Sequence, residues 1–267
     1  MVFPFRNILC PDDSVNAQAA LKYATAFARH GHGNVVLFNV EEAKTELASK
    51  IAQAAIDHDV DLITVALRDR NRLTRAFGSS LAEDIIAESP CAALAVRPPQ
   101  RDFVDGESEI QLKRVLLATN FRPSSVAATQ LATQMANQLG AELHAVYVIG
   151  DYFEQISVMF PEGGLAALTR LRSYVEERMA HLSRGGGATH IAEGRPYQEI
   201  VKLSDTIAAD LIVIGTAVHG SLFGSSQVLG SEIERVIRNA PCPVLCVPAA
   251  RVVTPLPALV TQIVPQT

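Results

Sequence analysis

The sequence predicts an α/β protein built from two successive copies of one unit, each with a parallel sheet covered by helices. Apolar runs such as DLITVAL and DLIVIG alternate with stretches of helical periodicity longer than ten residues, and this order of elements is typical of a parallel sheet. The runs are apolar at every position, as strands are when helices cover both faces of the sheet. The same succession of patterns occurs twice along the chain, which indicates an internal repeat.

The repeat is visible at both ends of each copy. FRNILCPDDSVNAQAALKYATAFARHG resembles LKRVLLATNFRPSSVAATQLATQMANQLG, which begins at Leu112; each reads as a short strand, a polar turn and a long amphipathic helix. SSLAEDIIAESPCAALAVRPP from Ser79 resembles GSEIERVIRNAPCPVLCVPAA from Gly230, with a helix, a turn at Pro-Cys and an apolar strand. We therefore predict one copy over residues 1–98 and a second copy over residues 112–248.

The copies differ in length, and two segments lie outside them. Residues 99–111 are polar and are predicted to form a linker, and residues 249–267 form a tail whose prolines favour an extended strap. The second copy has a longer middle, with an amphipathic helix expected from about 165 to 181 to pack on the sheet, followed by a strand, a Gly-Arg-Pro turn and a helix. The first copy lacks this strand–helix block, so we expect its sheet to be truncated at an edge.

Composition excludes several classes of partner. The 267 residues carry a net charge of -5, with 48% hydrophobic and 19% charged residues, so a core is available and no basic surface for nucleic acid or membrane is present. No apolar run approaches the roughly 20 residues of a membrane span, and the first residues lack the pattern of a signal peptide. We expect a cytoplasmic protein. The four cysteines lie in apolar stretches and are predicted to be buried thiols, not metal ligands.

The most informative stretch is GTAVHGSLFGSSQVLGSEIERV, which begins at Gly215 and joins an apolar strand to a predicted helix. Gly220 is followed by nine residues and then by Gly230-Ser231, and the backbone N–H groups of such a loop can form a hollow that binds an anion. The helix that begins near Ser231 adds its positive N-terminal end. The alternative is a flexible surface loop in which Ser231 only caps the helix.

Together, these motifs resemble the universal stress protein family, here as a tandem of two domains. The resemblance covers nearly the whole chain except the linker and tail, and rests on ILCPDDS and VLLATNF, EGRPYQEIV, ADLIVIGT, the glycine loop and GSEIERVIRNAPCPVLCV. It implies Rossmann-like domains of the adenine nucleotide alpha hydrolase-like type, with five parallel strands in a complete sheet. It also implies that ATP or AMP, with or without Mg²⁺, binds through Gly-x2-Gly-x9-Gly-Ser/Thr, and that domains dimerise by pairing their last strands.

The resemblance places the nucleotide site in the second copy. The Gly-x9-Gly-Ser pattern is kept from Gly220 onward, but Ala217 stands where the first glycine belongs and the nearest glycine is Gly215. Asn120 stands where family members often carry an acidic residue, and the main chain of Val148 is expected to face adenine. The candidate nucleotide-binding residues are Ala118, Thr119, Asn120, Val148, Gly215, Thr216, Gly220, Gly230, Ser231 and Glu232.

The first copy is predicted not to bind nucleotide in this way. At the same spacing it carries Ala66, Asp69 and Ser79, so the glycines are absent and the Asp69 carboxylate would repel a phosphate. Its acidic pair, Asp12-Asp13, could complete the other site only if the two copies met there, which we do not expect. We expect the first copy to supply a dimer-like interface within the chain; a homodimer of whole chains is a further possibility.

The sequence carries no convincing signature of catalysis. It has no nucleophile elbow and no Gly-Lys-Ser/Thr loop. PDDS and TNFRPSS stand where adenylating relatives of the fold carry a Ser-Gly-Gly-x-Asp-Ser loop. We therefore expect a nucleotide-binding regulator of a stress response and not an enzyme, with slow ATP hydrolysis as a weaker option. The alternative function is a scaffold that binds a partner protein and no nucleotide.

Overall fold

The computed structural model describes residues 3–12, 17–40, 46–67, 81–97, 100–150, 161–183, 187–216, 219–220 and 227–249. The first copy, here the first half, contributes the strands β1 (Asn7–Asp12), β2 (Asn34–Asn39), β3 (Leu62–Ala66) and β4 (Ala92–Val96). The second half contributes β5 (Arg114–Ala118), β6 (Glu142–Gly150), β7 (Ala188–Gly194), β8 (Leu211–Thr216) and β11 (Val244–Pro248).

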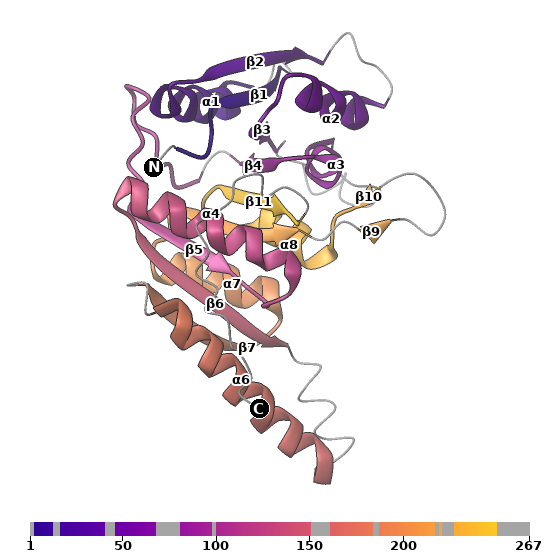
Figure 1. The fold of residues 1–267 in the computed structure, drawn as a ribbon, viewed down its shortest axis with the longest axis vertical. Helices are drawn as coiled ribbons and strands as arrows, with labels where there is room; N and C mark the ends of the chain where they lie inside the picture. Colours follow the sequence, from indigo (N-terminus) through magenta and orange to yellow (C-terminus); the bar gives the residue numbers. More distant parts are fainter. Residues whose placement is uncertain are drawn as a thin grey trace, which may run out of the picture.

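Within the described residues, these nine strands form one sheet in the order β2-β1-β3-β4-β11-β8-β5-β6-β7 (Figure 1). One face packs against α1 (Ala17–Gly31), α4 (Pro123–Leu139) and α6 (Pro161–Ser183). The other face packs against α2 (Leu47–Asp57), α3 (Leu81–Glu88), α7 (Pro196–Thr206) and α8 (Ser231–Asn239). Helices thus cover both faces, which explains the uniformly apolar strands and confirms the predicted α/β class.

The two halves join through their last strands. β4 and β11 pair antiparallel, with Leu94 opposite Leu245, while every other strand pair of this sheet is parallel. Leu94 and Leu245 follow Cys91 and Cys242 at the same distance in the two copies, so they are equivalent positions. An approximate two-fold axis therefore passes between them, and the last-strand pairing that the sequence implied between domains occurs within one chain.

The first half is truncated as predicted. Its strand order β2-β1-β3-β4 matches β6-β5-β8-β11 of the second half, and β7 continues the second half beyond β6. The described residues of the first half contain no counterpart of β7 or of α6, which packs on β6 and β7. The free edge of the first half is therefore β2. Predictions for Asp13, Asp69, Ser79, Ala217 and the tail after 249 concern residues outside the described part.

The connecting segment, residues 100–111 of the predicted linker, packs against α1 of the first half. Phe103 is 1% exposed, and the centre of its ring lies 4.9 Å from that of Tyr23 and 6.0 Å from that of Phe27, both on α1. Asp102 accepts hydrogen bonds from the Tyr23 hydroxyl (2.8 Å) and Lys22. Burial would raise the pKa of Asp102, but these bonds and one from the Val104 N–H lower it overall. The Phe103 ring and the Asp102 carboxylate thus anchor the segment to α1.

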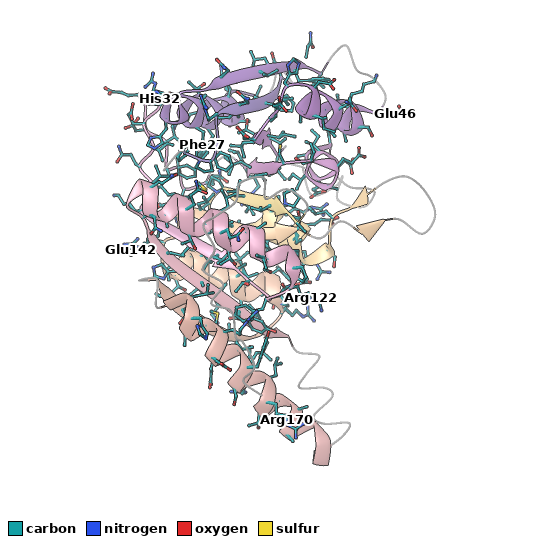
Figure 2. All side chains as sticks on the ribbon, viewed as in Figure 1. Phe27, His32, Glu46, Arg122, Glu142 and Arg170 are labelled. Atoms are coloured by element: carbon teal, nitrogen blue, oxygen red, sulfur yellow. The ribbon has the colours of Figure 1, made fainter. Side chains whose placement is uncertain are left out.

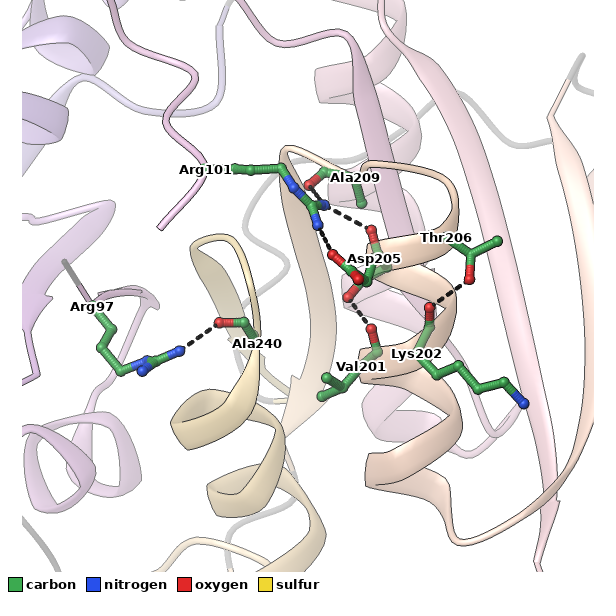
Figure 3. Close-up of polar contacts among 9 residues, drawn as sticks. Arg97, Arg101, Val201, Lys202, Asp205, Thr206, Ala209 and Ala240 are labelled. Atoms are coloured by element: carbon green, nitrogen blue, oxygen red, sulfur yellow. Dashed lines mark hydrogen bonds and ion pairs between the residues drawn. The ribbon is translucent and has the colours of Figure 1, made fainter. Parts of the chain in front are cut away.

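Two arginines fasten the first half and this segment to helix ends of the second half (Figure 3). Arg97 donates to the carbonyl of Ala240, which caps α8 at its C-terminus, at 3.0 Å. Arg101 donates to the carbonyls of Ser204 (2.9 Å) and Ala209 (3.1 Å), at the end of α7, and pairs with Asp205. The last carbonyls of a helix lack helical partners and carry partial negative charge, so each cation is stabilised there.

All four cysteines are buried as free thiols, as predicted. Burial raises the pKa of Cys246 to about 12, and burial is also the largest cause of the rise at Cys242, again to about 12. Such thiols are inert as nucleophiles because the thiolate is the reactive form. Helices of the described residues are either too short or too polar to cross a membrane.

Thr64 is a buried polar residue in β3, at a position that is apolar in the equivalent strand of the second half. Its hydroxyl oxygen has no hydrogen-bond partner among the described residues, and the equivalent position in β8 is Val213, which is fully buried. Thr64→Val should raise the free energy of unfolding by about 1 kcal/mol, because an unsatisfied buried hydroxyl is removed at constant shape. Urea denaturation would measure it. Val213→Thr is the matched reverse change and should destabilise; a less stable Thr64→Val protein would contradict the expectation.

Candidate functional site

The candidate site lies at the carboxyl ends of β5, β8 and β6. Ala118 at the end of β5 pairs with both Val146 of β6 and Ile214 of β8, and Val148 and Thr216 each lie two residues further along their strands. The chain runs from β5 outward to β6 and β7, and then returns to β8 and β11 on the other side of β5. This is a switch point of strand order, where open parallel sheets bind their ligands.

The turn after β5 is held by its own side chains. The side-chain oxygen of Asn120 accepts from the Ser125 hydroxyl (2.6 Å) and the Arg122 N–H (3.0 Å). Thr119 is buried and its N–H donates to the Val146 carbonyl at 3.0 Å. Asn120 is exposed, and its side-chain NH₂ has no partner among the described residues. The turn uses the acceptor oxygen of Asn120, so the donor NH₂ group is what remains for a ligand.

Arg122 is a cation at this edge that the sequence reasoning did not single out. It is the exposed N-cap residue of α4, next to Asn120. Figure 2 shows Arg122 and Glu142, the first residue of β6, at opposite ends of the strands of the second half. A sequence signal that could have pointed to it is its place directly before Pro123, the first residue of α4.

Gly215 is required by helix packing. A Cβ on Gly215 would lie 2.1 Å from the carbonyl oxygen of Ser124 and 3.0 Å from the Cα of Ser125, both in the first turn of α4. Gly215 is one of the candidate nucleotide-binding residues named from the sequence. The close approach that the structure shows is the one between β8 and α4.

The N-terminus of α8 is open. Gly230 is its N-cap, and the Gly230 carbonyl accepts from the N–H groups of Ile233 (2.9 Å) and Glu234 (3.1 Å). The N–H groups of Ser231 and Glu232 bond to no other described residue. A Cβ on Gly230 would meet nothing closer than the Ile233 side chain at 3.9 Å. N–H groups without an intrahelical partner at a helix N-terminus can bind an anion.

Glu232, a predicted site residue, uses its carboxylate to join helices. One oxygen accepts from the Tyr197 N–H in the first turn of α7 at 3.1 Å, and the other pairs with Arg235 at 3.0 Å. The Arg235 guanidinium lies 5.3 Å from the centre of the Tyr197 ring. The Glu232 side chain therefore positions the start of α7 beside the start of α8, and its main-chain N–H is the group left for an anion.

The glycine loop itself is described only at its ends. Gly220 lies in β9 (His219–Gly220), opposite Gln227 of β10 (Gln227–Val228); residues 217–218 and 221–226 are outside the described part. β10 lies against α3 of the first half (Figure 1). We expected the halves not to meet at the loop. They meet there because the pairing of β4 with β11 brings α3 beside α8.

An ion pair joins the halves close to the site. Glu83 of α3 is 1% exposed, and Arg238 of α8 binds both its oxygens, at 2.5 and 2.7 Å. Glu83 and Glu234 occupy equivalent positions in the two copies, so the approximate two-fold axis brings like charges together. Burial, and then the Glu83 charge, raise the pKa of Glu234. Arg238, whose counterpart is Ala87, compensates this repulsion.

Comparison with known proteins decides the family. A model of the universal stress protein family matches residues 40–97 and 111–248, which is more than half of the chain. The chain belongs to the universal stress protein family. The resemblance inferred from the motifs is thereby confirmed, and the two matched segments fall in the two halves.

Other universal stress proteins match about half of the chain. Universal stress protein MJ0531 of Methanocaldococcus jannaschii is 34% identical over 145 residues, which cover 51% of this chain and 81% of that protein. A universal stress protein of Thermus aquaticus is 33% identical over 138 residues, covering 51% of this chain and 98% of that protein. About half of the chain thus matches 81% of one relative and 98% of the other, as expected for a tandem of universal stress protein units.

Solved structures match the tandem over nearly its whole length. The match to PA1789, a protein of unknown function from Pseudomonas aeruginosa, spans 92% of this chain and 93% of PA1789, with a TM-score of 0.62 and 18% identity. The match to a universal stress protein from Archaeoglobus fulgidus spans 91% of this chain and 96% of that protein, with a TM-score of 0.60 and 20% identity. At these identities the likeness shows the fold alone.

Proposed function

We propose that this universal stress protein binds an adenine nucleotide, ATP or AMP, in its second half, and that it regulates a stress response without acting as an enzyme. The observation that carries the proposal is the N-terminus of α8, where the N–H groups of Ser231 and Glu232 bond to no other described residue and a Cβ on Gly230 would meet no described atom closer than 3.9 Å. It lies in the half with the glycine pattern, whose sheet has its switch point beside β8.

The proposed pose follows from the groups around this edge. The phosphates would lie at Ser231 and the start of α8, where N–H groups and the helix dipole favour negative charge, and Arg122 adds a cation. The ribose would meet the free NH₂ of Asn120. The adenine would lie along the main chain at Val148, near the end of β6.

The described side chains offer few groups that could bind Mg²⁺ or act as a catalytic base. Among the described residues no cluster of three or more metal-binding groups occurs, and the Glu232 carboxylate is engaged by α7. Mg²⁺ usually binds proteins through one or two carboxylates together with phosphates and water, so here it would be carried by the phosphates. Since Glu232 is the only acidic residue among the described candidate residues and its carboxylate is engaged, we propose that the site binds its ligand and does not turn it over.

A scaffold without nucleotide is the second candidate function. Two observations favour it: Ala217 replaces the first motif glycine, and Gly215, the nearest substitute, is used by helix packing. In that case the α8 N-terminus would be an ordinary exposed helix start, and the protein would act through partner binding.

Equilibrium titration with ATP and with AMP tests the proposal. Gly230→Asp should weaken binding at least about tenfold, a loss of about 1.4 kcal/mol, because the new carboxylate would occupy the anion position and repel the phosphates. Isothermal titration calorimetry would measure both nucleotides on both proteins. Mass spectrometry of small molecules released from undialysed protein would show whether the nucleotide is retained through purification.

Gly106→Asp is the matched control, since it adds the same charge at a glycine with no heavy atom within 4 Å, in the connecting segment. It should bind nucleotide as the wild type does. Equal affinity in wild type and Gly230→Asp would remove the α8 site, and no binding by the wild type would favour the scaffold.

A further inference from the structure

The free edge of the first half carries an exposed apolar residue. Within the described residues β2 pairs only with β1, so the outward N–H and C=O groups of Val35 and Leu37 have no strand partner there. Leu37 in β2 is 58% exposed. A single exposed leucine is ordinary on a protein surface, but comparison with the second half makes this one informative.

The equivalent strand of the second half is covered. The N–H groups of Asn34 and Glu142 make the same backbone bond, to the carbonyls of Arg6 and Lys113, each at 2.8 Å. This aligns Leu37 with the third residue after Glu142, which is 2% exposed because β7 and α6 cover β6. The strand–helix block that the first half lacks is thus the block that would cover Leu37.

β2 also lacks the usual protection of an edge strand. Exposed edges are commonly blunted by charged residues, prolines or bulges, whereas the six residues of β2, NVVLFN, include no charge and no proline. Its register with β1 is continuous over all six residues. The strand at the other edge of the sheet, β7, does carry a charged residue: Glu193, which forms an ion pair with Arg172 of α6. β2 is therefore the edge suited to accept another strand.

We propose that β2 is a dimerisation surface, on which a second copy of the chain adds its own β2 in antiparallel orientation. The two-fold axis of this dimer is perpendicular to the sheet and passes through Val36. Side chains that lie on one face of β2 therefore meet side chains of the same face in the partner. Val35 then lies opposite the partner's Leu37, and Leu37 lies opposite the partner's Val35. These residues form one apolar cluster on the α1 face and cover each other.

The occupant is a second copy because β2 is complementary to itself. An uncharged strand meets no repulsion from its symmetry mate, and a two-fold contact closes after two chains, so it does not propagate into fibres. The chain already uses this geometry at its centre, where the equivalent strands β4 and β11 pair antiparallel around Leu94 and Leu245. The inference is independent of nucleotide binding.

Sedimentation equilibrium over a range of protein concentrations tests the dimer. The wild type is expected at twice the mass of one chain, and Leu37→Lys should weaken dimerisation at least about tenfold, because it places two like charges beside the axis. Val126→Lys is the matched control: Val126 of α4 is 53% exposed and distant in sequence from β2. Circular dichroism would show that both variants are folded.

Hydrogen exchange of the Val35 and Leu37 N–H groups identifies what covers the strand, because the Asn34 N–H bonds to the Arg6 carbonyl and the N–H groups of a strand alternate in direction, so these two face away from β1. Protection that increases with protein concentration, and is lost in Leu37→Lys, supports the dimer. Protection independent of concentration in a monomer would mean that another part of the same chain covers the edge, and would overturn the proposal. A wild type that stays monomeric, or a Leu37→Lys protein that dimerises as tightly as the wild type, would also overturn it.

Discussion

Arg238→Ala is expected to lower the free energy of unfolding by about 2 kcal/mol. Removing one partner of a fully buried ion pair costs about 3–5 kcal/mol, because it leaves the other charge buried without compensation. Here Glu83 is fully buried, but the Arg238 side chain is 47% exposed, and solvent screening reduces the effect. Loss of Arg238 also leaves Glu83 next to Glu234, its equivalent in the other half. Guanidinium denaturation at neutral pH would measure the change.

Three further measurements distinguish loss of the ion pair from a general loss of packing. Lys202→Ala removes a cation from an exposed pair with Glu199 on α7, and should cost no more than about 0.5 kcal/mol. A buried carboxyl without its cation is more stable when protonated, so the deficit of Arg238→Ala should shrink as the pH falls below neutral. The combined change Glu83→Leu and Arg238→Leu should recover most of the stability. An Arg238→Ala protein as stable as the wild type would refute the assignment.

Gly215→Ala is expected to destabilise the protein by about 3 kcal/mol, the upper part of the range for overpacking a core. The added methyl group would lie 2.1 Å from the Ser124 oxygen and 2.7 Å from its carbonyl carbon. Both are backbone atoms, so no side chain can rotate away; the first turn of α4 must move from β8. Thermal and urea denaturation would measure the loss.

Gly150→Ala is the matched control, because a Cβ there meets nothing within 4 Å at the end of β6. The displaced turn contains Ser125, which binds Asn120, so Gly215→Ala should also weaken nucleotide binding. If the two alanine variants melted at the same temperature, the close contact between β8 and α4 would not exist in solution.

The sequence by itself determined the order of the elements, the repeat and the truncation. These depend on local patterns: apolar runs for strands, helical periodicity, Pro123 at the start of α4, and apolar surroundings for the cysteines. A further signal went unused. Asp61 and Asp210 precede equivalent strands, and each accepts two backbone N–H bonds from the start of a neighbouring strand, as Asp210 does from Lys113 and Arg114 at 2.8 Å. The repeated aspartate could have been recognised from the alignment of the two copies.

Only the tertiary structure decided how the candidate site is built and how the halves meet. Glu83 and Arg238 are 155 positions apart, and Arg101 and Asp205 are 104 apart; no local pattern relates such residues. The pairing of β4 with β11 brings α3 to α8 and to β10, which set the surroundings of the candidate site. Gly215 shows the same limit, since its need for glycine comes from the backbone of another element. Local sequence specifies each strand and helix, whereas burial between distant segments decides which side chains remain free to bind a ligand.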